Sequence, residues 1–428
     1  MAPRKSVLAI NGGPKAVKTP TGDIFKWPII TKEDEAACLE VLRAGKMSGI
    51  DVTLEFEKEF AKWHGMKYCL AHNTGTNALI GAMFGCRMGY GDEIICPSMT
   101  YWASALPAML LRSTIIYAEL CRDNLTIDPK DIEHRITKRT KAIMCVHYAG
   151  YPCDMDPIMK IAKKHKLKVI EDVSHAQGGL YKGRLVGTIG HVGAMSIMSG
   201  KSLPCGEGGM LVTDDQEIYE RALAFGHYER TGSDLTLPDL KKYAGLPLGG
   251  VKNRMHQLSS AVGRVQLRCY KKRMKEIQKA MDLFCDLIEE APGLRGHRPP
   301  KKSGSTCGGW YAAHAMYYPE ELGGLDIGHF ARAVKAEGAA VCGPGANLLM
   351  HLHPVLNEAD VYHEGKPTRI AYSNRDVRQP LGSLPVTEAS PKRCMSIPWF
   401  KHYRPRIIRE QAAAFVKVAA HADEVPRD

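Results

Sequence analysis

Apolar positions recur along this chain in two spacings, one typical of amphipathic helices and one typical of buried strands. Residues 31–45 and 53–65 show the helical spacing, and the first of these segments opens on Thr31, a favourable helix cap followed by an acidic turn. Both segments end at a glycine. The same spacing predicts helices at residues 158–165, 216–225, 260–290 and 327–337, and short apolar runs predict strands at 67–71, 93–96, 113–117, 142–146, 167–170 and 310–318.

Strands and helices alternate between residues 67 and 225, which is typical of a mostly parallel sheet covered by helices. Beyond residue 270 the chain becomes rich in glycine and proline, as at Pro292-Gly293 and Pro299-Pro300, which indicates a domain boundary. We therefore expect an α/β protein in three parts. These are an irregular N-terminal arm (1–30), a large domain (31–270) and a smaller C-terminal domain (271–428).

The stretch from Val169 to Asp215 carries the most specific chemistry. Asp172 ends an apolar run, as acids do where buried parallel strands open into a site, and Lys201 stands in a Gly-Lys-Ser turn before CGEGG. Such a carboxylate can keep a pyridinium N–H protonated, and a desolvated lysine is a nucleophile near neutral pH. Ser196, near another strand end, can donate to a phosphate. Singly, such an acid is often a helix cap and such a lysine is usually solvated, but together they fit pyridoxal 5'-phosphate.

The order of Asp172, His175, Ser196, Lys201 and the sequence GEGG resembles the DegT/DnrJ/EryC1/StrS sugar aminotransferase family, within the fold-type I pyridoxal phosphate enzymes. The resemblance covers most of the chain. It implies a large domain with a mostly parallel sheet flanked by helices, and a small C-terminal α+β domain. It also implies an aminotransferase that uses pyridoxal 5'-phosphate and takes the amino group from glutamine or glutamate.

The resemblance adds residues to the predicted site. Gly75 and Thr76 open a helix whose free N–H groups attract a phosphate, and they match the phosphate-binding turn of the family. Tyr101 matches the aromatic residue that stacks on the cofactor ring, and His175 matches a position that contacts the cofactor. Asn253 is expected to bind the phosphate of a neighbouring subunit, which implies a homodimer with shared active sites.

The phosphate role of Asn253 has an alternative in the sequence. Aligning the family segment on Arg254-Met255 puts Lys252 where many members carry their asparagine, so the role falls on either residue. The neighbouring aromatic residue of the stacking position, Trp102, is expected in the core.

Composition narrows the partners and the compartment. The net charge is +12 in 428 residues, but the basic residues are dispersed among acids, so no nucleic-acid partner is expected. No apolar run approaches the roughly 20 residues of a membrane helix, and the opening MAPRKSVLAINGG lacks the apolar core of a signal peptide. These two observations favour a cytoplasmic protein without membrane contact. The thirteen cysteines form no regular framework, so we expect reduced thiols and no metal site.

The acceptor is expected to be a keto-cyclitol, such as scyllo-inosose, or a keto-sugar. Many sugar-nucleotide members of the family carry threonine at the position of Gly200 and are shorter than this chain, and the segment GGLDIGHF resembles a segment of the cyclitol enzymes. The resemblance therefore favours the cyclitol. A nucleotide-linked keto-sugar is the alternative. Related dehydratases carry a histidine in place of the lysine, and a non-catalytic member would be expected to lose Lys201 or Asp172, so both are less favoured.

Overall fold

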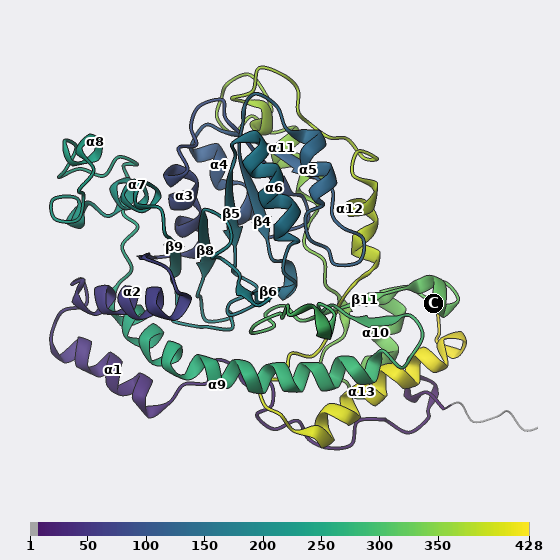
Figure 1. Ribbon diagram of the computed structural model, residues 1–428. Coiled ribbons are helices and arrows are strands. Elements are labelled where there is room, and N and C mark those ends of the chain that lie inside the picture. Colours follow the sequence, from purple (N-terminus) through teal and green to yellow (C-terminus); the bar gives the residue numbers. More distant parts are fainter. Residues whose placement is uncertain (1–6, 428) are drawn as a thin grey trace, which may run out of the picture.

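The computed structural model describes residues 7–427, and within them seven strands form one large sheet with the order β1-β9-β8-β5-β4-β2-β3 (Figure 1). Only β9 runs antiparallel to its neighbours in this sheet. The sheet is therefore mostly parallel, as the sequence predicts. Its strands are β1 (Tyr68–His72), β2 (Glu93–Pro97), β3 (Thr114–Ala118), β4 (Thr140–Val146), β5 (Lys168–Asp172), β8 (Val192–Ser196) and β9 (Gly209–Thr213).

Helices cover both faces of this sheet because its strands are apolar on both sides. Along β4 the buried side chains alternate between two clusters: Ile143 and Cys145 face one, whereas Ala142, Met144 and Val146 face the other. The first cluster is closed by α2 (Asp51–His64), α5 (Pro129–Arg135) and α6 (Met155–His165), and the second by α3 (Gly75–Gly85), α4 (Pro107–Leu110), α7 (Gln216–Gly226) and α8 (Pro238–Lys241). Figure 1 shows α3 and α7 on one side of the sheet and α6 on the other.

Two helices lie beneath the large sheet. The first, α1 (Lys32–Arg43), begins at Thr31, whose hydroxyl accepts from the N–H of Asp34 while the Asp34 carboxylate accepts from the N–H of Thr31. The second, α9 (Gln257–Ile288), packs Tyr270 in the core of the large sheet and Phe284 in a second core nearer the C-terminus. A single continuous helix therefore joins the two cores, and the predicted division at residue 270 stays a prediction.

The second core surrounds a small antiparallel sheet with the order β10-β11-β13-β12. Its elements are β10 (Leu294–Gly296), β11 (His314–Tyr317), β12 (Gly343–Pro344), β13 (Cys394–Ser396), α10 (Ile327–Ala336) and α13 (Pro405–Ala420). Leu8 and Ile24 of the N-terminal arm are buried in this core, and Trp27 packs against it. The N-terminal arm therefore packs against the C-terminal part of the chain. Its first six residues lie outside the described residues.

The chain between β12 and β13 returns to the large sheet, with two short helices, α11 (Pro354–Asn357) and α12 (Pro385–Ala389). It covers the edge strand β3. The Gln379 amide donates to the carbonyl of Tyr117 at 2.9 Å and accepts from the N–H of Tyr117 at 3.3 Å, as a neighbouring strand would. This segment therefore shields an edge that would otherwise be free to pair. A two-stranded ribbon, β6 (Leu180–Tyr181) and β7 (Arg184–Leu185), completes the strands.

The helices of the described part of the chain are too short or too polar to span a membrane.

Candidate active site

A cavity of about 470 Å³ lies where the carboxyl ends of β1, β2, β5 and β8 meet the small sheet. Ligands of α/β proteins bind at this edge of a sheet. The cavity brings together seven of the eight residues that the sequence predicts for the site: Gly75, Thr76, Tyr101, Asp172, His175, Ser196 and Lys201. The segments at residues 311–314, 345–347 and 396 close it from the side of the C-terminal part.

One end of the cavity is the N-terminus of α3. Thr74 caps this helix by accepting from the N–H of Asn77 at 3.1 Å. The other N–H groups of the first turn have no intrahelical partner, because no turn of the helix precedes them. Gly75 lies against Ser196, since a Cβ atom at Gly75 would stand 2.4 Å from the Cβ of Ser196. Glycine thus lets a hydroxyl approach the positive end of the helix dipole, an arrangement suited to a phosphate.

Asp172 is the last residue of β5 and is 4% exposed. Its Oδ2 accepts from the hydroxyl of Ser104 at 2.7 Å, and its Oδ1 accepts from the N–H of Ser174 at 3.0 Å. These two donors fix the orientation of the carboxylate. A buried carboxylate held in this way can bind a cationic ring N–H in the cavity.

Lys201 is 7% exposed, and its Nζ lies 3.9 Å from the centre of the Tyr311 ring. Burial lowers the pKa of Lys201 to about 8, with the negative charge of Asp172 opposing the shift. The carbonyl of Lys201 accepts from the indole N–H of Trp27 at 2.9 Å. The arm therefore holds the turn that carries this amine. Because of the lowered pKa, the amine is partly deprotonated near neutral pH.

His175 is buried beside the lysine. The N–H of Ala149 donates to its Nδ1 at 3.3 Å, so the ring hydrogen of the neutral imidazole belongs on Nε2. Burial, together with the nearby Lys201 and His314, holds the pKa of His175 well below its ordinary value. This histidine is neutral at neutral pH and can donate one hydrogen bond to a ligand.

Tyr101 and Trp102 are adjacent exposed aromatic residues, and only Tyr101 lines the cavity. Tyr101 is 49% exposed and lines the cavity, which leaves its ring free to lie on a flat ligand. Trp102 is 46% exposed, so the expectation that it belongs to the core is wrong. It lies in a 3-10 turn, Trp102–Ser104, that begins outside the sheet, and it lines a neighbouring hollow of about 390 Å³.

Asn253 is the predicted site residue that does not line this cavity. Its side chain is 1% exposed and lies against Gly226, where a Cβ atom would stand 2.6 Å from the Asn253 Nδ2. Lys252 is exposed on the surface of the same segment. A role for either residue in a neighbouring subunit stays a prediction.

Other residues of the site carried no signal in the sequence. Ser104 and Ser174 are ordinary serines until the fold brings both onto Asp172. Tyr311 lies in the region expected to be strand, but it precedes β11 and faces Lys201. Only the tertiary structure, which joins segments distant in the chain, identifies these three.

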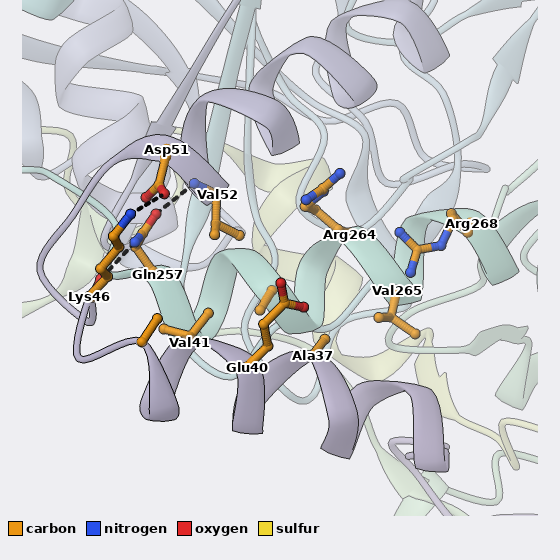
Figure 2. A pocket seen from close by; sticks show the side chains of 12 residues that line it. Ala37, Glu40, Val41, Lys46, Asp51, Val52, Gln257, Arg264, Val265 and Arg268 are labelled. Atoms are coloured by element: carbon orange, nitrogen blue, oxygen red, sulfur yellow. Dashed lines mark hydrogen bonds and ion pairs between the residues drawn. The ribbon is translucent and has the colours of Figure 1, made fainter.

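A second hollow, of about 300 Å³, lies between α1, α2 and α9 (Figure 2). Several of its polar groups are paired with one another. Gln257 accepts from the N–H of Val52 and donates to the carbonyl of Lys46, both at 2.6 Å, and Lys46 forms a 3.6 Å ion pair with Asp51. The labelled side chains include no buried acid beside a buried lysine, so the chemistry resides in the first cavity.

The first cavity fits pyridoxal 5'-phosphate on three observations. Its volume of about 470 Å³ lies in the range of small-molecule sites. The glycine cradle at Gly75 and the hydroxyl of Ser196 provide donors for a phosphate, whereas Asp172 provides an acceptor for a ring N–H. Lys201 provides a buried amine for covalent attachment.

Comparisons with known proteins agree with this geometry. The family model described as the DegT/DnrJ/EryC1/StrS aminotransferase family matches residues 28–414. The spore coat polysaccharide biosynthesis protein SpsC of Bacillus subtilis is 30% identical over 361 residues, which cover 83% of this chain and 91% of that protein. A GDP-perosamine synthase of Caulobacter vibrioides is 38% identical over 248 residues, 58% of this chain and 64% of the synthase.

Among solved structures, the aminotransferase from Psychrobacter cryohalolentis superposes with a TM-score of 0.78 at 27% identity, over 93% of this chain and 99% of that one. The similarity thus includes both the large sheet and the C-terminal part. Because the family model spans most of the chain, this protein belongs to the DegT/DnrJ/EryC1/StrS aminotransferase family and is a pyridoxal 5'-phosphate-dependent aminotransferase with the fold-type I architecture.

Proposed function

We propose that this enzyme transfers an amino group from glutamine or glutamate to the ketone of a sugar-like ring, either a keto-cyclitol or a keto-sugar. The observation that carries the proposal is the buried amine of Lys201, whose pKa is lowered to about 8, in one cavity with the buried carboxylate of Asp172. Amino transfer needs a base that gains and loses a proton near neutral pH.

Each residue of the cavity has a part in this reaction. Pyridoxal 5'-phosphate, when bound, supplies an electron sink for the carbanion that forms when the α proton of the donor leaves. Lys201 holds the cofactor covalently at rest. When its amine is released, it takes the α proton of the donor and returns a proton to the C4' atom of the cofactor. Asp172 keeps the ring nitrogen protonated. His175 donates a hydrogen bond from Nε2, and Tyr101 orients the ring by stacking.

The phosphate is assigned to the opposite end of the cavity. The N-terminal N–H groups of α3 at Gly75 and Thr76, together with the hydroxyl of Ser196, are its ligands within one chain. We further propose that the enzyme is a homodimer in which Asn253 or Lys252 of the second copy completes the phosphate site. This resembles the arrangement in the family, and the exposed position of Lys252 favours it over Asn253.

The acceptor has two candidates, each with its own support. The cavity and the neighbouring hollow have Lys201 as the only lysine and have no arginine among their lining residues, so within one chain they fit an uncharged ring such as a keto-cyclitol. The similarity to GDP-perosamine synthases favours an acceptor carried on a nucleotide. A diphosphate on that acceptor would need cations supplied from outside this lining.

One experiment separates the candidates. Purified enzyme loaded with pyridoxal 5'-phosphate is incubated with glutamine or glutamate labelled with ¹⁵N and with a panel of keto-cyclitols and nucleotide-linked keto-sugars. A product whose mass shows the gained ¹⁵N amino group identifies both donor and acceptor, and the Lys201→Ala protein is the control. The proposal fails if no ketone of either class gains nitrogen from either donor while the wild-type enzyme binds its cofactor.

A further inference from the structure

A serine, a histidine and a glutamate form a buried row beside the active cavity, outside the residues assigned above. The hydroxyl of Ser98 lies 2.7 Å from Nδ1 of His351, and Nε2 of the same ring lies 3.1 Å from Oε1 of Glu388. Ser98 follows β2 directly, whereas His351 and Glu388 belong to the segment that returns to the large sheet between β12 and β13.

These three residue types also occur in hydrolases, but this row has no nucleophile that a substrate can reach. Ser98 and His351 are both 0% exposed, and neither lines a described cavity. A catalytic serine must face its substrate. The row is therefore structural in origin, and its effect must pass through the residues that it holds.

Every donor in the row meets an acceptor when the histidine is neutral. Glu388 accepts only, so the ring hydrogen lies on Nε2, and Nδ1 then accepts from the hydroxyl of Ser98. The oxygen of that hydroxyl accepts in turn from the N–H of His351 at 3.0 Å. Burial lowers the pKa of His351, with Glu388 opposing the shift, which agrees with the neutral ring. A fully satisfied buried network fixes its members in one arrangement.

The row ends on the loop that supports the acid of the active site. From Ser98 the loop continues to Thr100, whose hydroxyl lies 3.0 Å from that of Ser104, and Ser104 donates to Asp172 at 2.7 Å. Tyr101, which lines the cavity, lies between these hydroxyls in the sequence. The position of Ser98 therefore affects both the place of Tyr101, which is proposed to stack on the cofactor ring, and the hydrogen bond from Ser104 to Asp172.

The same row also anchors the opposite wall of the cavity. The N–H of Met350 donates to the carbonyl of Ser98 at 3.2 Å, and Met99 pairs with Leu349 as an isolated β-bridge. A few residues earlier Asn347 lines the cavity and accepts from the hydroxyl of Tyr148 at 2.8 Å. Two walls of the active site thus meet at one histidine.

We propose that His351 is a positioning residue of the aminotransferase, which holds the loop 98–104 and the wall at Asn347 in register so that Asp172 and Tyr101 keep their places on the cofactor. The inference rests on the proposed roles of Asp172 and Tyr101. It does not depend on which acceptor the enzyme uses.

Three variants test the inference. Ser98→Ala removes one hydroxyl and little volume, and His351→Leu removes both hydrogen bonds of the row. Glu388→Gln keeps an acceptor for Nε2 while removing the charge. The matched control is His297→Leu, because His297 is 1% exposed, its ring bonds the carbonyl of Asn124, and His297 is not among the residues that line the cavity. Amide hydrogen exchange of the cofactor-free proteins reports on the loop without any reaction.

In Ser98→Ala and His351→Leu, we expect the amides of residues 98–104 to exchange about tenfold faster or more, since a local opening then costs less free energy. The visible circular dichroism of bound pyridoxal 5'-phosphate should change, and kcat should fall by about 10- to 100-fold while KM for the donor changes less, because small displacements of catalytic groups cost up to about that much. Glu388→Gln should retain most of the wild-type behaviour.

The control and the mildest variant decide the outcome. His297→Leu should leave loop exchange, cofactor dichroism and kcat close to wild type, even if its melting temperature falls. The inference is overturned if folded Ser98→Ala shows wild-type exchange at residues 98–104 and wild-type dichroism, or if His297→Leu changes both as much as His351→Leu does. Failure of the proposed function would instead appear as a wild-type enzyme that binds cofactor but aminates no ketone.

Discussion

At the scale of single residues, the site depends on side chains whose chemistry is altered by burial. Lys201 stands over the face of Tyr311 at 3.9 Å, and its aliphatic stem is enclosed. Removing water from an ammonium group favours its neutral form. The same amine on the surface would be almost fully protonated at neutral pH, and it would neither attach a cofactor nor accept a proton at a useful rate.

The first prediction follows from the pKa of Lys201, which burial lowers to about 8. Only the neutral amine attacks an aldehyde, so the rate at which cofactor-free protein captures pyridoxal 5'-phosphate should rise about tenfold for each pH unit below 8 and then level off. Stopped-flow absorbance measures this rate. Lys201→Ala should form no covalent adduct, and a rate that keeps rising to pH 10 would contradict the lowered pKa.

A second prediction concerns the charge of Asp172. Asp172→Asn keeps the size of the side chain and can still accept from Ser104 or Ser174, but it removes the negative charge that favours a protonated ring nitrogen. We expect kcat to fall by roughly 100- to 1,000-fold, as when one preorganised electrostatic contact is removed. Steady-state kinetics with saturating cofactor measures the effect. Ser104→Ala, which keeps the charge, should lose much less, and near-normal turnover of Asp172→Asn would refute the assigned role.

The sequence predicted those site residues that stand at recognisable places. Asp172 ends an apolar run, Gly75 opens a helix after its cap, and Lys201 stands in a Gly-Lys-Ser turn, so each has a local signal, and the fold places all three in one cavity. Ser104 and Tyr311 have no local signal, since their roles come from contacts with Asp172 and Lys201 across the fold. Trp102 was expected in the core, yet it is exposed and lines a hollow.

At the scale of elements, the strongly periodic helices and strands were predicted almost to their ends, but β9 was not predicted as a strand, and of β8 only the end near Ser196 was expected. Both carry glycine at tight contacts. A Cβ atom at Gly209 would stand 2.3 Å from the carbonyl oxygen of Thr74, and one at Gly193 would stand 2.5 Å from that of Gly187. Glycine weakens the alternating pattern of a strand. In β9 it is required by the close approach of the α3 N-terminus, and in β8 by that of the backbone at Gly187.

The N-terminal arm is an element without regular structure that nevertheless acts on the site. Trp27 packs against Trp399 of the C-terminal part, with ring centres 5.4 Å apart, and its indole N–H holds the carbonyl of Lys201. The arm therefore joins the lysine turn to the second core. This hydrogen bond places Trp27 beside the active site.

A third prediction tests this element. Trp27→Phe keeps an aromatic ring but removes the hydrogen bond to the Lys201 carbonyl, so we expect kcat to fall by about 2- to 10-fold, the equivalent of one ordinary hydrogen bond. Cofactor content, measured by absorbance, should decrease less. Trp63→Phe is the matched control, since Trp63 packs against Phe60 and Tyr270 on α2 and α9, and among the described residues no hydrogen bond joins its indole to the lysine turn. Equal losses in both variants would show a general packing effect instead.

At the scale of the whole molecule, two cores are tied together by three segments. These are the continuous helix α9, the N-terminal arm and the segment that returns from β12 to cover β3. The active cavity lies between the two cores and takes side chains from both. Such a cavity cannot be read from the sequence of either part, because its walls at Asp172 and His314 come from different sheets.

The assembly of the molecule is the remaining question, and the segment around Asn253 bears on it. Asn253 Nδ2 is buried and has no hydrogen-bond partner within residues 7–427, so it could donate to a ligand, but its side chain is enclosed against Gly226. Lys252 is exposed beside it and carries a charge that pairs well with a phosphate. If the segment reaches a second copy, Lys252 can contact that copy without rearrangement of the core, whereas Asn253 cannot.

The last prediction therefore separates the two residues and the dimer in one design. Lys252→Ala should weaken cofactor binding by roughly 10- to 150-fold, the loss of one hydrogen bond to a charged group, whereas Asn253→Ala should mainly lower the melting temperature. When Lys252→Ala is mixed with Lys201→Ala and subunits exchange, each hybrid dimer regains one site free of both changes, so activity should return. Rescue by Asn253→Ala instead of Lys252→Ala would assign the role to the asparagine. A protein that sediments as an active monomer, or hybrids that form but stay inactive with both partners, would exclude a shared site.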